Sequence, residues 1–463
     1  MNERDFAISV VKKLQEAGHQ ALWAGGCVRD ELLGLPPKDY DVATNAVPEA
    51  VQKLFRRTIS IGASFGVVEV LGPRQDDDYL KVQVATFRTD GGYSDGRRPD
   101  QVVFASARED ALRRDFTVNG MFFDPIRSEL HDFVDGQKDL HARILRAIGD
   151  PVVRFQEDKL RLLRAVRIAT RFELTIEPQT EAALRTMAGE LPVVSAERIA
   201  EELRQLLVHP RRVRGLNLLL DLGLAATILP EIVPMKGLPQ GPPDQPTGDL
   251  WEHVMRVLDF IGPAPSFPLA MATLLHDVGK PNTVGRVSLP LSSEEMSPDV
   301  TKHSVKERFT FYHHEHVGAR MADEIAMRLK LSNAERERLT WLVEKHQYLA
   351  DAPKMRPSKL KTTLSHAGIH ELLALHRADA LATPKSIAHV EFCEQLLRQW
   401  TPADLNPPGL VTGRDLMELG MQPGPRYKEL LDAIREAQLD GTIKTREDGL
   451  DLLKRLMTGQ CNK

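Results

Sequence analysis

The sequence contains few cysteines and no long apolar segment. Its three cysteines, Cys27, Cys393 and Cys461, show no paired spacing. Disulfide bonds and cysteine-based zinc sites are therefore not expected, and a reducing cytoplasm is the default location. No apolar run approaches the roughly 20 residues that are needed to span a bilayer, so we expect no membrane partner. Residues 1–20 alternate charged with apolar side chains, which predicts an amphipathic helix rather than a signal peptide.

The sequence also lacks a large excess of either charge. The net charge is −4 at pH 7, a value that neither establishes nor excludes a nucleic-acid partner. A nucleic-acid enzyme needs only a local basic surface, and the arginines are clustered. The clusters are Arg56–Arg57, Arg97–Arg98, Arg113–Arg114 and Arg211–Arg212 with Arg214. Any single pair is more often solvated surface, so the clusters matter only if they surround a site.

Internal repeats and low-complexity segments are absent as well, and 463 residues exceed the size of a single core. Short β-type runs mixed with helical segments predict an α+β fold for the first part, a mixed sheet with helices. Leu, Ala and Arg at helical spacing predict all-helical domains after it. The expected strands are 21–24, 40–43, 67–71, 80–87 and 101–104, and a long loop is expected at 285–303. The expected domains are 1–150, 151–234, 235–400 and 401–463.

Two aspartates at alternate positions form the most informative pattern. Asp39 and Asp41 flank a tyrosine at the start of an expected strand. Residues two apart on a strand point to the same face, so the two carboxylates should project together. Carboxylates that close repel unless a cation lies between them, and Mg²⁺ prefers carboxylate and phosphate oxygens. This chemistry is typical of nucleotidyl transfer, in which metal ions activate a hydroxyl and stabilise the leaving oxygen.

A glycine pair and an arginine precede these aspartates. Gly25 and Gly26 follow an apolar strand and supply a turn that a ligand can approach closely. The helix expected next would present free backbone N–H groups to a phosphate, and Arg29 in its first turn would add a fork of donors. The order of strand, turn, helix and aspartate pair makes a functional site much more specific than a lone pair of acids.

These residues resemble the catalytic signature of class II CCA-adding enzymes and bacterial poly(A) polymerases, in the polymerase beta nucleotidyltransferase superfamily. The resemblance continues through residues 20–230 and in the tail after 409. Segment 86–100 is similar to the family's flexible loop, and LRRDFTVNGMFFDP at 112–125 to its ribose-recognition motif. The resemblance implies that Arg114 contacts the nucleotide. A carboxylate such as Asp115 can accept hydrogen bonds from both ribose hydroxyls, although a surface salt bridge is the simpler reading of Arg113–Arg114.

The segment EDKLRLLRAVR resembles the family's base-recognition helix. Asp158, Arg161, Arg164 and Arg167 recur every three residues, which makes a slowly drifting stripe on a helix. A carboxylate accepts from an amino group and a guanidinium donates to ring nitrogens and carbonyls. The resemblance implies that Asp158 and Arg161 select C and A, with Arg164 and Arg167 contacting the nucleotide. An arginine-rich helix that packs on an acidic neighbour has the same spacing.

A second group of histidines and aspartates lies in 250–380. It resembles the HD phosphohydrolase superfamily, whose members bind one or two divalent metals. Imidazoles and carboxylates together suit a transition metal or Mg²⁺, and a metal-bound water could hydrolyse a phosphoester of damaged RNA. A degenerate, inactive HD fold is the alternative, and His313 and His316 are interpreted as bystanders. The expected ligands are His253, His276, Asp277, His314, His346 and Asp379.

The resemblance implies a tRNA nucleotidyltransferase that adds CCA from CTP and ATP to the 3′ end of tRNA. A poly(A) polymerase and an enzyme that adds only A remain alternatives. Enzymes that add only CC lack much of the flexible loop, which is present here at full length. A phosphohydrolase whose first part merely binds RNA is disfavoured by the two aspartates. The helical tail and the arginines near 211–214 are candidates for gripping the RNA.

Overall fold

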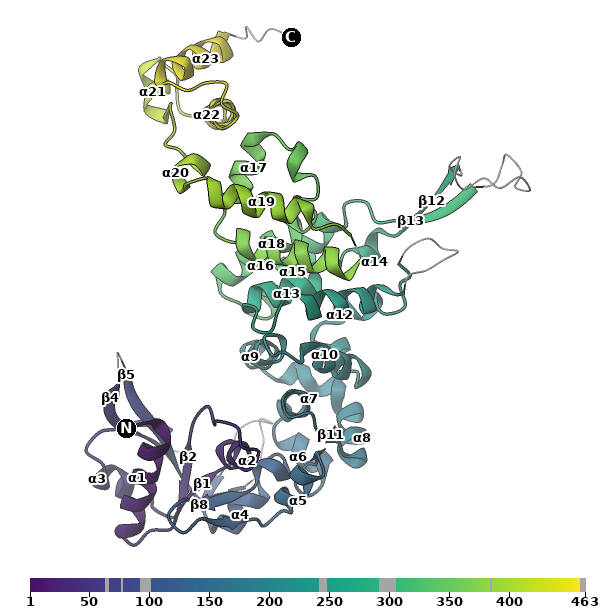
Figure 1. Ribbon diagram of the computed structural model, residues 1–463. Helices are drawn as coiled ribbons and strands as arrows, with labels where there is room; N and C mark the ends of the chain where they lie inside the picture. Colours follow the sequence, from purple (N-terminus) through teal and green to yellow (C-terminus); the bar gives the residue numbers. More distant parts are fainter. Residues whose placement is uncertain are drawn as a thin grey trace. The chain divides into compact units, whose positions relative to one another are not determined.

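The computed structural model describes residues 1–62, 66–75, 78–91, 101–240, 248–290, 305–383 and 385–458. Figure 1 traces the chain, which divides into two compact units, Met1–Pro230 and Glu231–Lys463. The α+β fold class is confirmed: a mixed sheet with helices comes first and a helical region follows. None of the helices in the described part is both long and apolar enough to cross a membrane. The finer division into four domains stays a prediction.

The first unit is built on a seven-stranded sheet of order β3-β4-β5-β2-β1-β8-β9. Strands β2 and β5 run parallel, and the other neighbours run antiparallel. The strands are β1 (Ala21–Ala24), β2 (Asp41–Thr44), β3 (Thr58–Gly62), β4 (Val67–Gln75), β5 (Asp78–Thr86), β8 (Phe122–Asp124) and β9 (Glu129–His131). A separate pair joins β6 (Arg88–Gly91) to β7 (Gln101–Phe104), and another joins β10 (Ile144–Leu145) to β11 (Thr175–Ile176).

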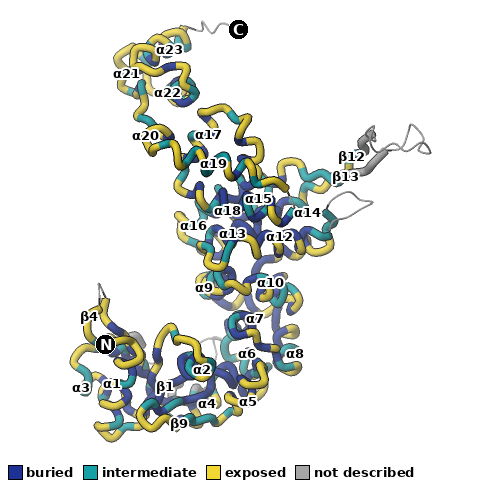
Figure 2. The backbone as a smooth tube through the Cα atoms, viewed as in Figure 1, coloured by how far each residue is buried: buried dark blue, intermediate teal, exposed yellow. Residues whose placement is uncertain are grey.

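One face of this sheet is covered by a helix, and the opposite face is only partly open, because Ala107 and Ala111 pack against its centre. Helix α1 (Glu3–Glu16) buries its apolar stripe and contacts β1, β2 and β5. Strand β5 alternates accordingly: Leu80 and Val82 are buried, whereas Lys81 and Gln83 are exposed. The central strand β1 is buried at every residue (Figure 2). This alternation leaves polar side chains on the open face, which is where Asp41 projects.

Five strands fall close to their predicted positions, and the short strands β3, β8 and β9 were missed because three to five residues carry little periodicity. The segment resembling a flexible loop, 86–100, begins as strand instead: β6 takes its first part, and residues 92–100 lie outside the described residues. The other helices of the head are α2 (Gly26–Leu32), α3 (Pro48–Leu54), α4 (Ala107–Leu112) and α5 (Gly136–His141), with a 3₁₀ turn η2 (Thr117–Asn119).

The rest of the first unit is helical. Helix α7 (Arg161–Arg171) packs its buried Leu, Val and Ile residues against α9 (Ala196–Leu207) and α10 (Arg212–Asp221), which leaves its arginines on the opposite stripe. The remaining helices are α6 (Pro151–Glu157), α8 (Pro178–Met187) and α11 (Ala225–Ile228), with 3₁₀ helices η3 (Ala188–Val193) and η4 (Pro230–Met235), the latter crossing into the second unit.

The second unit is a helical domain followed by a small tail. The helices of the domain are α12 (Leu250–Phe260), α13 (Phe267–Leu275), α14 (Lys280–Thr283), α15 (His314–Arg328), α16 (Asn333–Lys345), η5 (Ala352–Lys354), α17 (Pro357–Leu364), α18 (Ile369–Ala382), α19 (Ala388–Gln399) and α20 (Pro402–Leu405). The tail helices α21 (Gly413–Glu418), α22 (Pro425–Leu439) and α23 (Arg446–Thr458) share a core of their own around Leu416, Ile434 and Leu453.

The long loop predicted at 285–303 was partly wrong. Strand β12 (Gly285–Pro290) pairs antiparallel with β13 (Val305–Thr310), while residues 291–304 lie outside the described residues. The apolar residues of GRVSLP alternate with polar ones, a period of two that suits a strand. The segment 235–248 is rich in Pro and Gly, and its residues 241–247 also lie outside the described part.

Candidate functional site

The two aspartates of the sequence pattern line one cavity in the first unit. Asp41 is the first residue of β2, and Asp39 lies just before the strand, which begins one residue later than predicted. The cavity has a volume of about 500 Å³, and Gly25, Gly26 and Lys38 also line it. The two acids therefore open into a single space beside the glycine turn.

The carboxylate of Asp41 is held in an unfavourable environment. Its pKa is raised to about 6, first because the surrounding protein atoms limit hydration and second because the Asp39 carboxylate repels it, while Arg114 acts in the opposite direction. The side chain nevertheless remains exposed to the open cavity. A divalent cation fits beside these two carboxylates, because it would favour the ionised form of Asp41.

We expect Asp41→Asn to raise the melting temperature of the metal-free protein by about 2 °C at pH 8. The raised pKa means that the folded state holds the Asp41 proton more tightly than the unfolded state between pH 4 and 6. The stability contributed by that proton is lost as the pH rises through this window, whereas the asparagine of the variant stays neutral and loses nothing. Thermal unfolding followed by circular dichroism between pH 4.5 and 8 measures the difference in melting temperature between the variant and wild type. A difference that does not widen with pH would contradict the raised pKa of Asp41 as the cause.

The glycine turn is shaped by close contact with an arginine. Gly25 has a φ of +75°, and a Cβ atom there would lie 2.8 Å from Nη1 of Arg114. Any other residue would be strained and would push this arginine away. Arg114 is held by Asp110, which accepts from its Nε and Nη2 at 3.1 and 3.0 Å. The turn and Arg114 therefore line the cavity as one packed unit.

Arg29 is placed differently from the prediction. It lines the cavity, but it is buried and its guanidinium is already engaged. It donates to Asp30 at 2.6 and 2.9 Å and to the side-chain carbonyl of Asn119, and it lies 3.9 Å from the centre of the Phe172 ring. The guanidinium of Arg29, which was expected to bind phosphate, thus connects α2 to Asn119 and to Phe172, the residue that follows α7.

Asp115 lies at the junction between the sheet and the helices. Its Oδ1 accepts from the Phe116 backbone at 2.8 Å and from Asn119 at 3.1 Å, and its Oδ2 lies 2.9 Å from Nη2 of Arg164. Burial alone would raise its pKa, but the Arg164 and Arg161 guanidinium groups hold it below its usual range. Among the described residues, Oδ2 of Asp115 and Nε of Arg164 are buried without a hydrogen-bond partner. The carboxylate of Asp115 and the guanidinium of Arg164 thus form one ion pair in the wall of the cavity.

The structure divides the residues of the predicted base-recognition stripe between a turn and a helix. Arg161 begins α7, whereas Asp158 lies in the extended turn before it. Asp158 is not paired with Arg161: it receives two hydrogen bonds from Arg198 at 2.7 and 3.2 Å, and Arg161 pairs with Glu157 at 2.6 Å. Both still line the cavity, together with Arg164 and Arg167.

Helix α9 supplies residues that the sequence analysis missed. Arg198 holds Asp158, and one turn later Glu202 accepts from Arg167 at 2.6 Å. The spacing of four residues on an amphipathic helix was the available signal, because it places both charges on one face. Eight basic and five acidic side chains line the cavity, so its walls favour a polyanion.

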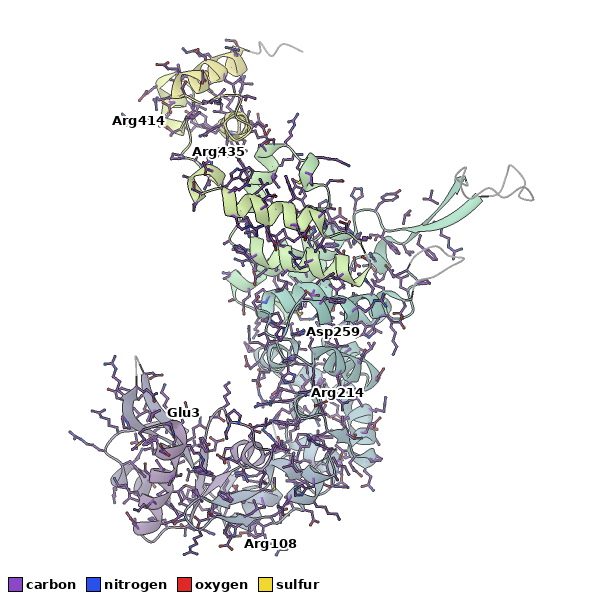
Figure 3. All side chains as sticks on the ribbon, viewed as in Figure 1. Glu3, Arg108, Arg214, Asp259, Arg414 and Arg435 are labelled. Carbon is purple, nitrogen blue, oxygen red and sulfur yellow. The ribbon has the colours of Figure 1, made fainter. Side chains whose placement is uncertain are left out.

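The arginines near 211–214 each have a partner within the first unit. Arg212 is buried and donates to the Leu207 carbonyl at 2.8 Å. Arg214, labelled in Figure 3, is exposed and donates to the Leu174 carbonyl at 2.7 Å. Arg211 is exposed as well, and it pairs with Glu173 at 2.5 Å.

The second unit brings all six predicted HD residues together. His276 and Asp277 follow α13, and His314 begins α15. The Asp277 carboxylate joins two groups. Its Oδ2 lies 3.5 Å from His253 and 3.3 Å from His276, and its Oδ1 lies 3.1 Å from His314 and 3.6 Å from His346. Oδ1 of Asp379 lies 3.2 Å from His253. The arrangement is thus two trios of possible ligands that share one aspartate.

The histidine rings present lone pairs toward one another. Nδ1 of His276, His314 and His346 lies 2.7 Å from a backbone carbonyl in each case, so this nitrogen carries the proton. The Nε2 atoms of His314 and His346 then both carry lone pairs and face each other at 3.3 Å, and Nε2 of His276 faces Nε2 of His253 at the same distance. Two lone pairs cannot form a hydrogen bond, so a cation beside the His314–His346 pair fits this arrangement.

The local backbone and a lysine support this arrangement. A Cβ atom on Gly279 would lie 2.3 Å from the His314 carbonyl, so only glycine lets the loop after Asp277 pack against the start of α15. Burial acts to raise the pKa of Asp277, but Lys280, 2.7 Å away, and the adjoining histidines hold it well below its usual range. The carboxylate is therefore ionised and ready to bind a metal. Lys280 was missed because a lone lysine after the pair carries no spacing signal.

Three parts of the chain match known families. Residues 21–146 match the poly A polymerase head domain, residues 173–235 the probable RNA and SrmB-binding site of polymerase A, and residues 250–383 the HD domain. The sheet with its aspartate pair, the helices with the arginine stripe and the histidine cluster fall within these three segments or beside them.

The relatives agree with these matches. The chain is 43% identical over 223 residues to the CCA-adding enzyme of Lactiplantibacillus plantarum, covering 48% of this chain and 53% of that protein. It is 38% identical over 248 residues to poly(A) polymerase I of Haemophilus influenzae, covering 50% of this chain and 53% of that protein. The match spans about half the length of these relatives.

The fold as a whole resembles solved structures. The Bacillus stearothermophilus CCA-adding enzyme in complex with CTP superimposes with a TM-score of 0.70 and 26% identity over 99% of both chains. The Thermotoga maritima CCA-adding enzyme complexed with tRNA shares the fold at a TM-score of 0.53 and 18% identity, over 98% of this chain and 95% of that one. The chain therefore combines a poly A polymerase head domain, a polymerase A RNA-binding segment and an HD domain, in the fold of solved CCA-adding enzymes.

Proposed function

We propose that the chain is a tRNA nucleotidyltransferase that adds CCA to tRNA 3′ ends from CTP and ATP, without a nucleic-acid template. The observation that carries the proposal is the shared cavity, in which the Asp39–Asp41 pair, the glycine turn and the arginine stripe lie together. Relatives of the same architecture have been solved with CTP, with ATP and with tRNA. The basic walls of the cavity suit a triphosphate.

The reaction follows from the geometry of the site. The terminal 3′ oxygen of the RNA attacks the α-phosphorus, a new O–P bond forms, the bond to the β-phosphate oxygen breaks, and pyrophosphate leaves. The hydroxyl proton passes to solvent. Asp39 and Asp41 would hold Mg²⁺, which supplies activation of the hydroxyl and charge neutralisation at the phosphates. Gly25, Gly26 and Arg114 would position the triphosphate.

Ribose selection is assigned to Asp115. Its Oδ2 lies 2.9 Å from Nη2 of Arg164, which keeps the carboxylate ionised. An ionised carboxylate accepts strongly from hydroxyl groups, and a deoxynucleotide would offer it one hydroxyl fewer. The site would therefore favour ribonucleotides.

Base selection is assigned to Asp158 with Arg161. Three of about four lone-pair positions on Asp158 are used by Arg198 and the Leu160 N–H, which leaves one acceptor. The amino groups of cytosine and adenine can donate to it, whereas the carbonyl that uracil or guanine carries at the same position would be repelled. Arg198 fixes the direction of this acceptor.

The products decide between this function and its close alternatives. A purified preparation is given tRNA that lacks its CCA end, with CTP alone, ATP alone, or both. We expect two added nucleotides with CTP alone and three with both. Addition of A only to tRNA that already ends in CC would indicate an A-adding enzyme, and a long A ladder would indicate a poly(A) polymerase.

A second activity is proposed for the HD domain, namely metal-dependent hydrolysis of a phosphoester such as a 2′,3′-cyclic or terminal phosphate on RNA. The facing Nε2 atoms and the shared Asp277 support a divalent transition metal or Mg²⁺ held by the six residues described above. When bound, such a metal would supply an activated water. Lys280 would keep Asp277 ionised and add positive charge near the substrate phosphate.

A further inference from the structure

A third group of metal-binding side chains lies on the surface of the second unit. His313, Glu315 and His316 each offer one ligand atom, and these atoms all lie within 4.8 Å of one another. The chain enters α15 from β13 at this point (Figure 1), where both histidines are exposed and Glu315 is half-buried. We call these three residues the outer trio. It is separate from the two buried trios that share Asp277, and none of its members was predicted as a ligand.

The backbone at the start of α15 brings these side chains together. His313 directly precedes the helix and has a φ of +61°, in the left-handed region that residues other than glycine seldom adopt. The rings of His313 and His316 lie nearly parallel, with 19° between their planes. Strained backbone of this kind is often found where a side chain serves a ligand, so the conformation of His313 points to a use for its imidazole.

The carboxylate of Glu315 lies between two histidines without a hydrogen bond to either. Its Oε1 is 3.8 Å from Nε2 of His316, and its Oε2 is 3.7 Å from Nδ1 of His314. Both distances exceed the length of a hydrogen bond, and Nδ1 of His314 already donates to the Phe311 carbonyl at 2.7 Å. The Glu315 side chain is only 24% exposed, so a carboxylate with limited hydration faces His316 across a gap that one ion can fill.

Two imidazoles and one carboxylate form a ligand set for a divalent transition-metal ion. Imidazole nitrogens suit Zn²⁺, Ni²⁺ and Cu²⁺, and two histidines with one glutamate are an established zinc ligand set. Bonds of about 2.1 Å place two ligand atoms of one ion about 3 to 4 Å apart, a range that includes the 3.8 Å between Glu315 and His316. The dipole of α15 opposes a cation at its first turn, but this effect lowers affinity by only about five-fold.

We propose that the outer trio binds a divalent transition-metal ion, such as Zn²⁺ or Ni²⁺, at the surface of the second unit. The ion would tie the residue before α15 to the first turn of this helix, on either side of His314. Three protein ligands leave the rest of its coordination to water, so the ion exchanges with solvent and dialysis removes it. The outer trio takes no part in the hydrolysis proposed for the buried cluster, and the proposal depends on neither proposed activity.

The test measures metal binding by the untagged full chain without the buried cluster. The parent protein carries His276→Ala and Asp277→Ala, and excess Mg²⁺ is present to occupy the aspartate pair, whose carboxylates suit this hard cation. We expect titration calorimetry with Ni²⁺ to show one site per chain in the parent. Adding His313→Gly and His316→Ala should weaken its affinity by about a hundred-fold or more, because both imidazoles are lost. Glycine is chosen at 313 because it adopts a φ of +61° without strain.

Further variants separate the outer trio from other surface histidines. His370→Ala, an exposed histidine on α18, is the matched control and should leave the affinity and the number of sites unchanged. Glu315→Gln keeps the shape of the side chain but removes its charge, and it should weaken Ni²⁺ binding by about ten-fold. If circular dichroism shows that the parent is unfolded, equilibrium dialysis against Ni²⁺ in the wild-type background decides instead. His313→Gly with His316→Ala should then bind one ion fewer per chain than wild type.

Equal Ni²⁺ binding with and without the two histidines would overturn the proposal. An equal loss of binding in His370→Ala would overturn it as well, because the ion would then bind surface histidines without preference. The outcome is independent of the buried cluster. A wild-type protein whose bound ions are all lost with His313 and His316 would refute the proposed HD metal site and still support the outer trio.

Discussion

Replacing both Asp39 and Asp41 by alanine should reduce nucleotide addition by about a thousand-fold or more. The two carboxylates line one cavity with the glycine turn, and the raised pKa of Asp41 shows that their charges are uncompensated without a cation. Loss of both would remove the Mg²⁺ site, whose contribution of several kcal/mol to the transition state corresponds to this factor. Incorporation of labelled CTP into tRNA lacking its CCA end measures the effect.

The double variant should keep its fold and its second activity. Asp39 lies in a loop and Asp41 is exposed at the start of β2, so neither side chain supports the core. Circular dichroism and any phosphoesterase activity of the HD domain should therefore match wild type. Glu49→Ala, an exposed acid on α3, is the control for a general loss of negative charge. Nucleotide addition that survives the double change would refute the assignment of the metal-binding pair.

Replacing His276 and Asp277 by alanine should remove the metal from the second unit and abolish phosphoester hydrolysis there. Asp277 is shared by both trios, so its loss disrupts both halves of the cluster at once. Metal content after dialysis, measured by mass spectrometry, should fall to background. Hydrolysis of a 2′,3′-cyclic nucleotide should fall by about a thousand-fold. Nucleotide addition should stay within two-fold, because the aspartate pair belongs to the other unit.

The exposed histidines beside this cluster provide the control. His313 and His316 lie on the surface on either side of His314 in the sequence, and their stacked rings have centroids 6.2 Å apart. A variant with both replaced by alanine should keep the buried metal and the hydrolytic activity. Equal metal content in wild type and in the His276/Asp277 variant would contradict the buried site. Loss of nucleotide addition in a folded variant would show that the two sites are coupled.

The central motifs could be predicted because their geometry is local. Asp39 and Asp41 are two residues apart, and Gly25 and Gly26 end the preceding strand, so the chain itself brings the aspartates close together. The ligands of the HD cluster lie as far apart as His253 and Asp379, and they were predicted from the resemblance to a known superfamily instead. Strand β12 and the short strands of the sheet were missed or placed wrongly, since brief segments carry too little periodicity to define a structure.

The partners of the charged side chains depended on contacts between distant segments. Arg198 lies 40 residues from Asp158, and nothing within the segment 157–167 distinguishes that pairing from the expected one with Arg161. Arg29 was predicted to donate to a phosphate, but in the folded chain its guanidinium contacts Asn119 and Phe172. A guanidinium binds whichever acceptor lies within hydrogen-bond distance, and only the tertiary structure decides which acceptors those are.

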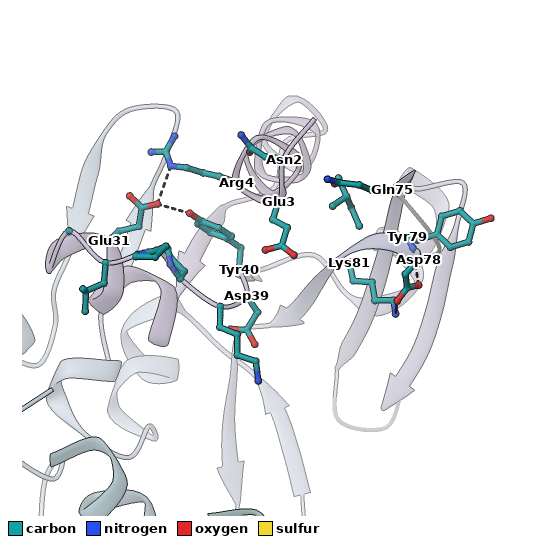
Figure 4. A pocket seen from close by; sticks show the side chains of 16 residues that line it. Asn2, Glu3, Arg4, Glu31, Asp39, Tyr40, Gln75, Asp78, Tyr79 and Lys81 are labelled. Atoms are coloured by element: carbon teal, nitrogen blue, oxygen red, sulfur yellow. Dashed lines mark hydrogen bonds and ion pairs between the residues drawn. The ribbon is translucent and has the colours of Figure 1, made fainter. Parts of the chain in front are cut away.

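The sequence by itself determined which residue types stand at which spacing: an aspartate pair after a glycine turn, an arginine-rich helix, and histidines and aspartates that could hold a metal ion. The tertiary structure alone decided how these groups are arranged. It places one oxygen of Asp277 in each of two ligand trios, and it pairs Arg167 of α7 with Glu202 of α9. It also forms a second cavity between the start of α1 and the β4–β5 hairpin (Figure 4). The physical reason is the distance along the chain over which each effect acts. Backbone periodicity acts over a few residues, whereas burial and ion pairing join groups that only folding brings together.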